Sequence, residues 1–427
     1  MFYGRVILVL STINVAVEGA VKQLFPVLLV VFVSTFGWSN AATAAVFGVG
    51  GLAGGLVSPL MGTLLDRLGP RVVFPLGGLL LGIGFLALSG VSHLWQLFLI
   101  YPLFVAVGEN IVSAYLNAAN LSNWFHRKRG QVIGIADAGT GLGILLFVPL
   151  AQILIMEIGW REALQWLALV FSLIVIIPNA VLQRRLPQDV GQYPDGELNP
   201  TERSTQPATE AHQKQDSQGL SFRNVVTSGA LWSLFFGRMF SSAADYLVTV
   251  HRIAFLIAIG YTGLTAASTI GFIGVVSIGS RPLAGILSDR IGREWTVTLS
   301  QAFWAIGLIS VAVLGDGSQL WPLVVFVILL GLSGGPISIA ISAKTADLFA
   351  GQASGRAQGM INLGRGLGIG MGPWIGGMLV DATGGYILAF TLAGAFAVAS
   401  GTFIWIARHQ GVTLLRKRGV VASASSD

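Results

Sequence analysis

Ionisable side chains interrupt several long apolar stretches of this sequence, and their balance favours the binding of an anion. Six basic and four acidic residues lie within such stretches, so positive charge is in excess. A charge in hydrocarbon costs several kcal/mol unless it is paired or faces water, so these residues indicate a water-filled cavity. The acidic residues are Glu18, Glu109, Asp137 and Asp245, and the basic residues are Lys22, Arg238, Arg252, Arg281, Lys344 and Arg365. Arg238, Arg252 and Lys344 lie nearer the ends of their stretches, where long side chains can instead reach the membrane interface.

Arg281 and Arg365 are the strongest candidate ligands for an anion. A guanidinium stays ionised and offers a planar fork of donors that matches a carboxylate. Arg365 stands between two glycines, which leave room for a ligand, although it can also be a gate residue that pairs with Asp137. Arg281 has no acid within two helical turns on its own stretch except Asp289, so we expect it to face a water-filled cavity.

Glu18 and Lys22 are four residues apart, which places them on one face of a helix where they can neutralise each other. This pair can be structural. It can also be a proton site, because a buried lysine can lose its proton when a neighbouring anion leaves. Glu109 is a second proton candidate. Tyr115 and Asn117, on the same apolar stretch as Glu109, are candidate neutral donors to a substrate or contacts between helices.

The elements that carry these residues are those of an all-α membrane protein. Of 427 residues, 54% are hydrophobic and 10% are charged, against roughly a quarter charged in ordinary soluble domains. Apolar runs of about 20 residues, the length that crosses a bilayer as a helix, predict twelve transmembrane helices. They lie near residues 6–31, 42–61, 72–91, 97–121, 131–156, 163–183, 229–257, 262–284, 295–314, 321–345, 357–380 and 386–407.

The spans fall into two sets of six, separated by a polar segment. Residues 1–183 form a predicted N-terminal six-helix bundle, and residues 229–407 form a C-terminal one, followed by a tail, 408–427. The segment 184–228 is rich in Gln, Pro, Ser, Thr and acidic residues and is expected to be a flexible linker. All Lys and Arg residues of the loops, linker and tail except Arg161 fall on one side, so the positive-inside rule places both termini in the cytoplasm. We therefore expect a multi-pass protein of the cell (inner) membrane, with a first span that is retained rather than cleaved as a signal peptide.

The composition disfavours most enzymatic and redox chemistry. Without cysteine the chain offers no thiolate nucleophile, Cys-ligated zinc or iron–sulfur cluster, and its five scattered histidines do not favour paired haem ligation. It has no Gly-rich Lys-Ser/Thr phosphate loop, which disfavours ATP-driven transport. The net charge of +6 is explained by the Lys and Arg residues of the loops, which set orientation in a membrane, and does not indicate nucleic-acid binding. We expect no enzyme activity, cofactor or metal, and the need for an accessory subunit is left open.

Two loops repeat one pattern at an interval close to half the chain. Gly62-Thr-Leu-Leu-Asp66-Arg67-Leu-Gly69-Pro-Arg71 follows the second predicted span, and Gly285-Ile-Leu-Ser-Asp289-Arg290-Ile-Gly292-Arg293 follows the eighth, at an offset of 223 residues. Gly130, Gly134, Gly139, Gly141 and Gly143 of the fifth span recur as Gly355, Gly359, Gly364, Gly366 and Gly368 of the eleventh, at an offset of 225 residues. These offsets indicate a tandem duplication, and paired six-helix repeats around a midplane cavity are typical of alternating-access transporters.

The paired loops resemble the signature loop of the major facilitator superfamily, and the resemblance covers the whole chain apart from the linker. It implies a fold of two pseudo-symmetric six-helix bundles. A tight glycine turn with Asp and Arg between two helices can hold a gate shut through charge pairs and helix-end dipoles, or can merely anchor a short loop. The implied gate residues are Asp66, Arg67, Arg71, Asp289, Arg290, Arg293 and Asp137.

Four shorter matches resemble the monocarboxylate transporter and oxalate/formate antiporter families. They are Asn123 to Gly130 running into Gly134-Ile135-Ala136, Arg281-Pro282-x-x-Gly285, the opening Phe2-Tyr3-Gly4, and Phe36-Gly37-Trp38-Ser39. The resemblance implies that Arg281 binds a substrate carboxylate, that Lys22 takes part in proton coupling, and that His251 can donate to a carboxylate, although His251 can also be an interface histidine. Arg365 falls where the oxalate/formate antiporter has its second basic residue. Ser277 stands where many monocarboxylate carriers have a carboxylate, so a proton route through that position is in doubt.

The function that this resemblance implies is secondary active transport of small organic anions by alternating access. Proton-coupled transport of a lactate-like or pyruvate-like monocarboxylate is the first expectation, with the anion, protons and the lipid bilayer as partners. Exchange of dicarboxylate or formate anions is an alternative, because two cavity arginines can clamp two carboxylates. A neutral-solute or drug carrier on the same fold is another. The two alternatives from other functional classes, a membrane enzyme and a non-transporting receptor, are disfavoured because neither accounts for gate loops at equivalent positions of the two halves.

Overall fold

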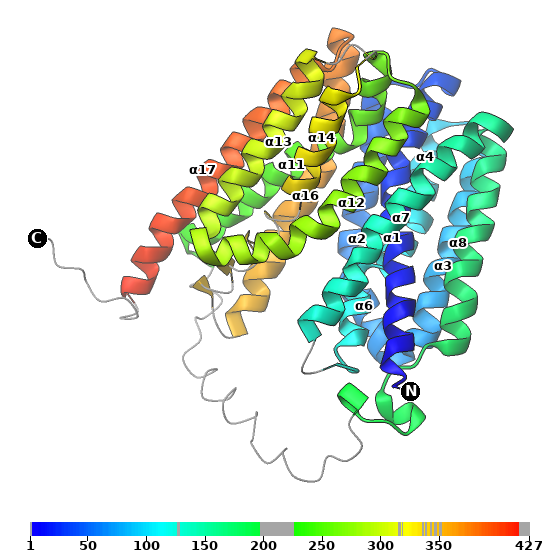
Figure 1. Cartoon of the computed structure of the whole chain (residues 1–427), viewed down its shortest axis with the longest axis vertical. Helices are drawn as coiled ribbons and strands as arrows, with labels where there is room; N and C mark the ends of the chain where they lie inside the picture. Colours follow the sequence, from blue (N-terminus) through cyan, green and yellow to red (C-terminus); the bar gives the residue numbers. More distant parts are fainter. Residues whose placement is uncertain are drawn as a thin grey trace, which may run out of the picture.

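The computed structural model shows a bundle of long helices (Figure 1). It describes residues 2–125, 129–196 and 226–417, except residues 315, 316, 318, 335, 336, 338, 339, 342, 343, 346, 347, 350 and 351. The first half contains α1 (Gly4–Phe36), α2 (Asn40–Leu68), α3 (Pro70–Ser89), α4 (Leu94–Ile100), the π-helix η1 (Tyr101–Ala106), α5 (Val107–Ile111), α6 (Ala114–Leu121), α7 (Arg129–Ile158) and α8 (Trp160–Leu182). The second half contains α11 (Gly229–Ala258), α12 (Gly263–Ile291), α13 (Arg293–Leu314), α14 (Trp321–Ser333), α16 (Gln352–Thr383) and α17 (Ile387–Lys417).

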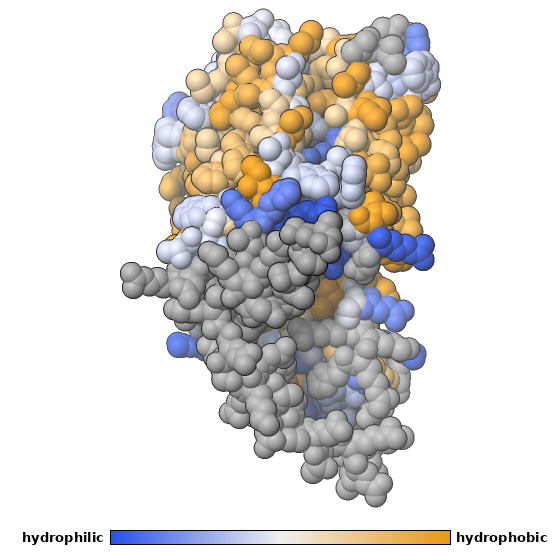
Figure 2. Space-filling view, turned by 90° about the vertical axis from the view of Figure 1, so that its left-hand side faces the viewer, coloured by the Kyte–Doolittle hydropathy of each residue, from blue (hydrophilic) through white to orange (hydrophobic). Residues whose placement is uncertain are grey.

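The described helices agree with the predicted all-α membrane architecture. Among the residues that the structure describes, nine helical segments are long and apolar enough to cross a membrane, and the segment Leu94–Trp124, which joins α4 to α6, is one of them. Three further elements occupy the remaining predicted spans. α11 and α16 have 30 and 32 residues but carry charges or many glycines, and α14 runs toward residues outside the described part. The upper part of the face in Figure 2 is largely hydrophobic, as a lipid-facing surface should be.

In the first half, the glycines of the repeat bring α7 against the backbone of α1. A Cβ atom at Gly139 would overlap the Thr12 carbonyl, and one at Gly143 would overlap the Ala16 carbonyl. Small residues at such positions let membrane helices pack closely, since apolar burial drives little association within lipid. These glycines therefore fix the contact between the first and fifth spans.

The second half repeats this contact. A Cβ atom at Gly364 would lie 2.7 Å from the Phe235 carbonyl oxygen, and one at Gly368 would overlap that of Met239. Thus α16 packs on α11 as α7 packs on α1, at the 225-residue offset of the sequence repeat. The sequence repeat is therefore also a repeat of helix packing, in which Gly139, Gly143, Gly364 and Gly368 stand where a side chain would overlap the neighbouring helix.

We predict that Gly143→Ala destabilises the protein, because its methyl group would overlap the α1 backbone. Overpacking of this kind costs about 1 to 3 kcal/mol, which should appear as a lower Tm in detergent. Gly134→Ala is the matched control on the same helix, since its Cβ would meet nothing within 4 Å. The control should keep or raise the Tm through helix propensity. Equal Tm values for both variants would contradict the proposed role of glycine packing.

The segment after α8 differs from the predicted flexible linker at its start. Residues 187–190 and 194–196 form two short 3-10 turns, η2 (Pro187–Val190) and η3 (Pro194–Gly196). The Tyr3 amide donates to Gln192 Oε1 over 2.8 Å, and the Asp195 amide donates to the Trp124 carbonyl over 2.9 Å. These bonds tie the start of the linker to the N-terminus and to the end of the fourth span. Residues 197–225 lie outside the described part, and α17 continues beyond the predicted span end at 407 to Lys417.

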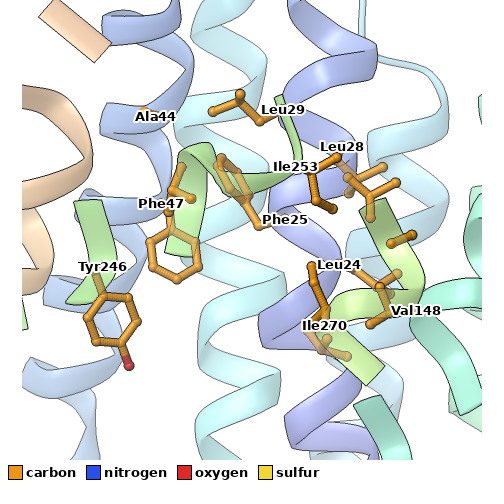
Figure 3. Close-up of a cluster of buried hydrophobic side chains, with 14 of the residues drawn as sticks. Leu24, Phe25, Leu28, Leu29, Ala44, Phe47, Val148, Tyr246, Ile253 and Ile270 are labelled. Carbon is orange, nitrogen blue, oxygen red and sulfur yellow. The ribbon is translucent and has the colours of Figure 1, made fainter. Parts of the chain in front are cut away.

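The two halves meet at the end of the molecule farthest from the N-terminus, which we call the distal end. Hydrophobic side chains from both halves form one buried cluster there (Figure 3). Its members include Leu24, Phe25, Leu28, Leu29, Ala44, Phe47, Val148, Tyr246, Ile253 and Ile270. The Asp381 carboxylate of α16 also accepts from the amides of Asn40 and Ala41, over 3.0 and 2.8 Å, and so caps the first turn of α2 across the halves. The distal end is closed.

At the opposite end, which holds the N-terminus and which we call the terminal end, the described helices of the two halves lie apart. A Cβ atom at Gly55 or Gly62 of α2, or at Gly359 of α16, would meet nothing within 4 Å. Closer to the distal end the same two helices touch, because a Cβ atom at Gly48 would lie against the Gly370 carbonyl. The halves therefore splay apart toward the terminal end (Figure 1).

Candidate functional site

A cavity of about 370 Å³ lies between the two halves, below the hydrophobic cluster of the distal end. A second cavity of about 930 Å³ adjoins it, lined by residues of α6, α7 and α12 that include Gly130 and Gln131 near the terminal end. The two cavities share the lining residues Ala114, Asp137, Ser277 and Gly334. Together the two cavities extend from the centre of the protein toward the terminal end.

Charged side chains from both halves line the 370 Å³ cavity, which we call the central cavity. The cations are Lys22, Arg238, Arg252 and Arg365, and the carboxylates are Glu18, Asp137 and Asp245. Arg238 and Arg252, which the sequence placed nearer the span ends, line this cavity. Positive charge is in excess among the described lining residues, which favours an anion.

Lys22 lies between two carboxylates. Its Nζ atom is 3.3 Å from Glu18 Oε1 and 3.2 Å from Glu109 Oε1. The Lys22 side chain is 28% exposed, while those of Glu18 and Glu109 are 14% and 13% exposed. Helical spacing predicted the contact with Glu18, whereas the contact with Glu109 comes from the packing of α5 beside α1. One ammonium therefore holds two carboxylates at the edge of the cavity.

The helix of the fourth span is interrupted beside this cluster, and Glu18 accepts a backbone hydrogen bond at the interruption. α5 ends at Ile111 and α6 begins at Ala114, whose amide donates to Glu18 Oε2 over 2.7 Å. Asn117 Nδ2 donates to the carbonyls of Val112 and Ser113 over 2.9 and 3.0 Å. Backbone groups freed within a membrane need such partners. The carboxylate at the start of α6 also opposes the positive end of its helix dipole.

Asn117 belongs to a buried network within the first half. Asn14 Nδ2 donates to the side-chain oxygens of Asn117 and Asn179, both over 3.1 Å. All three residues are 0% exposed. Asn117 is thus placed as an interhelical contact, the alternative to a substrate donor, and it is not among the cavity-lining residues. Asn14 and Asn179 did not stand out in the sequence, although amides in apolar spans are a general signal for such contacts.

Arg365 meets the central cavity from α16. Its Nη2 atom donates to the hydroxyl of Tyr246 over 3.2 Å. The Tyr246 ring packs on Phe47 in the distal cluster, with ring centroids 5.7 Å apart, and its hydroxyl points away from that ring (Figure 3). Tyr246 therefore links the closed distal end to the cation in the cavity, and the sequence did not single it out.

Arg252 also lines the cavity and connects the halves. It is 4% exposed, and its Nη2 atom donates to Gln23 Oε1 of α1 over 2.6 Å. Its Nε atom has no hydrogen-bond partner within the part of the chain that the structure describes. Gln23 follows Lys22 in the sequence, so the inter-half bond and the Lys22 cluster lie on adjacent residues.

Other predicted residues lie away from the central cavity. Tyr115 is 70% exposed and lines neither cavity. His251 is 0% exposed, and its Nε2 atom lies 2.9 Å from the Pro373 carbonyl oxygen in the core. Lys344 forms a buried ion pair with Glu294 instead of reaching the membrane interface. The side chains of Arg281 and Asp289 lie outside the described residues, although Ser277, four residues before Arg281, lines both cavities.

The predicted gate residues lie at the open terminal end. Asp66, Arg67 and Arg290 are exposed. The Arg71 Nε atom donates to the Ala180 carbonyl over 2.7 Å, and Arg293 Nη1 donates to Ser288 Oγ over 3.0 Å. Both of these bonds stay within one half. Asp137 differs from the other gate candidates, since it lies at the junction of the two cavities.

We predict that Asp381→Ala opens the distal end, because the α2 amides would lose the carboxylate that caps them from the other half. A lost cap costs about 0.5 to 2 kcal/mol, which shifts the open-to-closed ratio up to about 30-fold. The chain has no cysteine, so spin labels on Thr35→Cys and Leu388→Cys can report the distance between the halves. Asp189→Ala is the matched control, since Asp189 caps a turn at the start of the linker and makes no contact between the halves through this cap. An unchanged distance distribution in Asp381→Ala would rule out this gate contact.

Comparisons with known proteins agree with this architecture. The sequence profile of the Major Facilitator Superfamily matches residues 8–293 and 275–422. The chain is 27% identical to human (Homo sapiens) monocarboxylate transporter 11, over 82% of this chain and 71% of that protein. It is 24% identical to bovine (Bos taurus) monocarboxylate transporter 13, over 94% of this chain and 89% of that protein. It is also 24% identical to the oxalate:formate antiporter of Oxalobacter formigenes, over 76% of this chain and 72% of that protein.

Solved structures share the fold at low sequence identity. A bacterial homolog of the human lysosomal transporter Spinster, in an inward-facing and unoccupied conformation, gives a TM-score of 0.66 at 16% identity and covers 99% of both chains. A mutant of the nucleoside transporter NupG gives 0.69 at 16% identity, over 96% of this chain and 99% of that one. With the profile match along both halves and the paired-glycine packing of two six-helix bundles, this chain belongs to the major facilitator superfamily.

Proposed function

We propose that this multi-pass membrane transporter carries small organic anions together with protons, with a monocarboxylate as its main substrate. The observation that carries the proposal is the central cavity, where Lys22 sits between Glu18 and Glu109 beside Arg365. Fixed cations favour an anionic substrate, and a neighbouring set of exchangeable protons favours coupling. The relatives named as monocarboxylate transporters support this choice.

The carboxylate of the substrate binds the guanidinium groups of the cavity. Arg365 lies where both halves meet, and its fork can hold both carboxylate oxygens. Arg238 lines the same space and adds positive potential. We retain Arg281 as a predicted ligand because of its position on α12, one turn after the cavity-lining Ser277.

Proton coupling follows from the charge balance of the Lys22 cluster. One ammonium and two carboxylates leave a negative charge, which a single proton on Glu18 or Glu109 removes. Enclosing an anion between apolar layers is costly, whereas an anion with a proton is neutral and can be occluded at lower cost. This proton passes through Lys22, which releases its own proton as the substrate leaves because the departing anion no longer stabilises its charge.

The open terminal end and the closed distal end represent one state of an alternating-access cycle. With the termini in the cytoplasm, as the positive-inside rule predicts, this state faces inward. Asp66, Arg67 and their counterparts near Arg290 are exposed here, where they can pair when the terminal end closes. Release of the Asp381 cap and of the bond between Arg252 and Gln23 accompanies opening of the distal end.

Exchange of dicarboxylate or formate anions is the second candidate. It is favoured by Arg252 and Arg365, which line one cavity and can hold two carboxylates, and by the relative named oxalate:formate antiporter. Proteoliposome uptake of labelled lactate, pyruvate, acetate, formate, oxalate and succinate separates the two. Proton-coupled transport requires accumulation driven by an acid exterior without any internal anion. If uptake depended strictly on an internal anion and did not respond to pH, the proposal of proton-coupled transport would be wrong and anion exchange would take its place.

A further inference from the structure

The central cavity extends further into the second half than into the first. Besides α11, α12 and α16, its described lining includes Gln301 and Trp304 of α13 and Ala397 of α17. In the first half, lining residues come from α1, α6 and α7, and no described residue of α3 or α8 is among them. The repeat relates α13 to α3 and α17 to α8, so the two halves differ here in how they line the cavity, although they have the same arrangement of helices. We call the extension, lined by Gln301, Trp304, Leu330, Ser333 and Ala397, the recess.

The corresponding space of the first half is filled by side chains. Asn179 of α8 bonds to Asn14 of α1 over 2.8 Å, and Phe171 of α8 packs on Phe85 of α3 with ring centroids 5.5 Å apart. The six-helix bundle of the first half therefore fills the space that corresponds to the recess with its own side chains. In the second half the same region remains connected to the cavity.

The chemistry of the recess differs from that of the charged side of the cavity. The four cations among the described lining residues lie on α1, α11 and α16, whereas the described lining residues of α12 to α14 include Ile270, Ile273, Trp304 and Leu330. Trp304 and Leu330 are each 7% exposed. Gln301 Nε2 has no hydrogen-bond partner among the described residues, so it can donate to a ligand at the deep end. Buried polar atoms in native proteins normally have a partner, and a ligand can supply it.

The volume of the cavity exceeds what a short acid fills. At about 30 Å³ for each water, 370 Å³ holds roughly twelve waters, whereas lactate has only six non-hydrogen atoms. Pockets that enclose larger organic ligands begin near 300 Å³. A larger substrate that points its carboxylate toward the cations would direct its other end toward α13.

We propose that the preferred substrates are monocarboxylates with an aromatic ring, whose ring enters the recess and packs on Trp304. This inference rests on the proposed function, because it uses the same cations to hold the carboxylate. Trp304 is then a specificity-determining residue: it contacts the ring and leaves the carboxylate to Arg365. Ring burial and aromatic packing should together favour an aryl acid over acetate by about tenfold or more in affinity.

The test measures inhibition of labelled-substrate uptake in proteoliposomes by acetate, lactate, phenylacetate, 3-phenylpropionate and indole-3-acetate. In the wild type, the aryl acids should inhibit at roughly tenfold lower concentration than acetate and lactate. Trp304→Ala should remove this difference while the values for acetate and lactate stay within about twofold, and Trp304→Phe should retain most of it. Trp295→Ala is the matched control, since Trp295 lies on the same helix, is 56% exposed and is not a lining residue.

A second variant fills the recess without removing the tryptophan. Ala397→Leu should weaken the aryl acids and spare acetate and lactate. Transport of small carboxylates with no preference for aryl acids would overturn this inference and leave the proposed function intact. An equal loss for all acids in Trp304→Ala, in protein with unchanged Tm, would also overturn it. Failure of the wild type to bind or transport any carboxylate would overturn the proposed function and this inference together.

Discussion

Replacing Lys22 with arginine is expected to abolish accumulation driven by a proton gradient while the exchange of labelled for unlabelled substrate continues. Arginine keeps the positive charge between Glu18 and Glu109, but it does not release its proton in proteins. With one proton per substrate, each unit of pH difference gives about tenfold accumulation in the wild type, since 1.4 kcal/mol corresponds to a factor of ten. We expect a ratio near one in the variant.

Lys22→Gln tests the same cluster by removing the positive charge as well as the proton. Removal of the ammonium leaves two carboxylates without their cation, and breaking a buried ion pair typically costs about 3 to 5 kcal/mol. The double variant Lys22→Gln with Glu109→Gln restores the charge balance, so it should be more stable than Lys22→Gln alone and equally uncoupled. Accumulation at the wild-type level in Lys22→Arg would show that the coupling proton moves elsewhere.

Arg365→Gln is expected to cause the largest loss of substrate binding. Arg365 lines the cavity from α16, and its donors can meet a carboxylate there. Loss of a charge-assisted hydrogen bond costs about 1.5 to 3 kcal/mol, so the Kd measured by calorimetry in detergent should rise about 10- to 100-fold. Arg365→Lys keeps the charge without the fork and should show a smaller increase, closer to tenfold.

The controls for Arg365 separate its charge from its position. Tyr246→Phe removes the hydroxyl that accepts from Arg365 Nη2 and should weaken binding only slightly, since the charge remains. Arg408→Gln should leave the Kd unchanged, since the Arg408 guanidinium lies over the Trp405 ring of α17 and does not line the cavity. An unchanged Kd for every tested carboxylate in folded Arg365→Gln would exclude this residue as the anion ligand.

The predicted spans and the repeat needed no tertiary information. Insertion into hydrocarbon imposes a local cost on every residue, so a run of apolar residues already marks a span. The glycines at the 225-residue offset were readable for the same reason, because close helix contacts require small residues at fixed positions. The all-α membrane fold is confirmed, with nine candidate spans among the described residues, and the superfamily profile confirmed the resemblance that the loop motifs had indicated.

The sequence also located the charges of the central cavity, but it did not pair them. Lys22 and Glu18 are one helical turn apart, so their contact followed from spacing alone. Lys22 with Glu109, Arg252 with Gln23, and Arg365 with Tyr246 join residues on different helices. Which faces of those helices meet depends on their rotation and crossing, and these are fixed by the packing of whole bundles.

Tertiary structure decided the roles of the neutral residues as well. Asn117, His251 and Tyr115 were plausible substrate contacts by type, yet the fold buries the first two in their own halves and leaves the third exposed outside the cavity. Asp381, Gln23 and Trp304 looked ordinary in the sequence. A carboxylate at one helix end and an amide beside a lysine carry no signal alone, because each bonds to an element more than a hundred residues away. A tryptophan in an apolar span carries none either, because its place in the cavity lining depends on several helices that enclose this space.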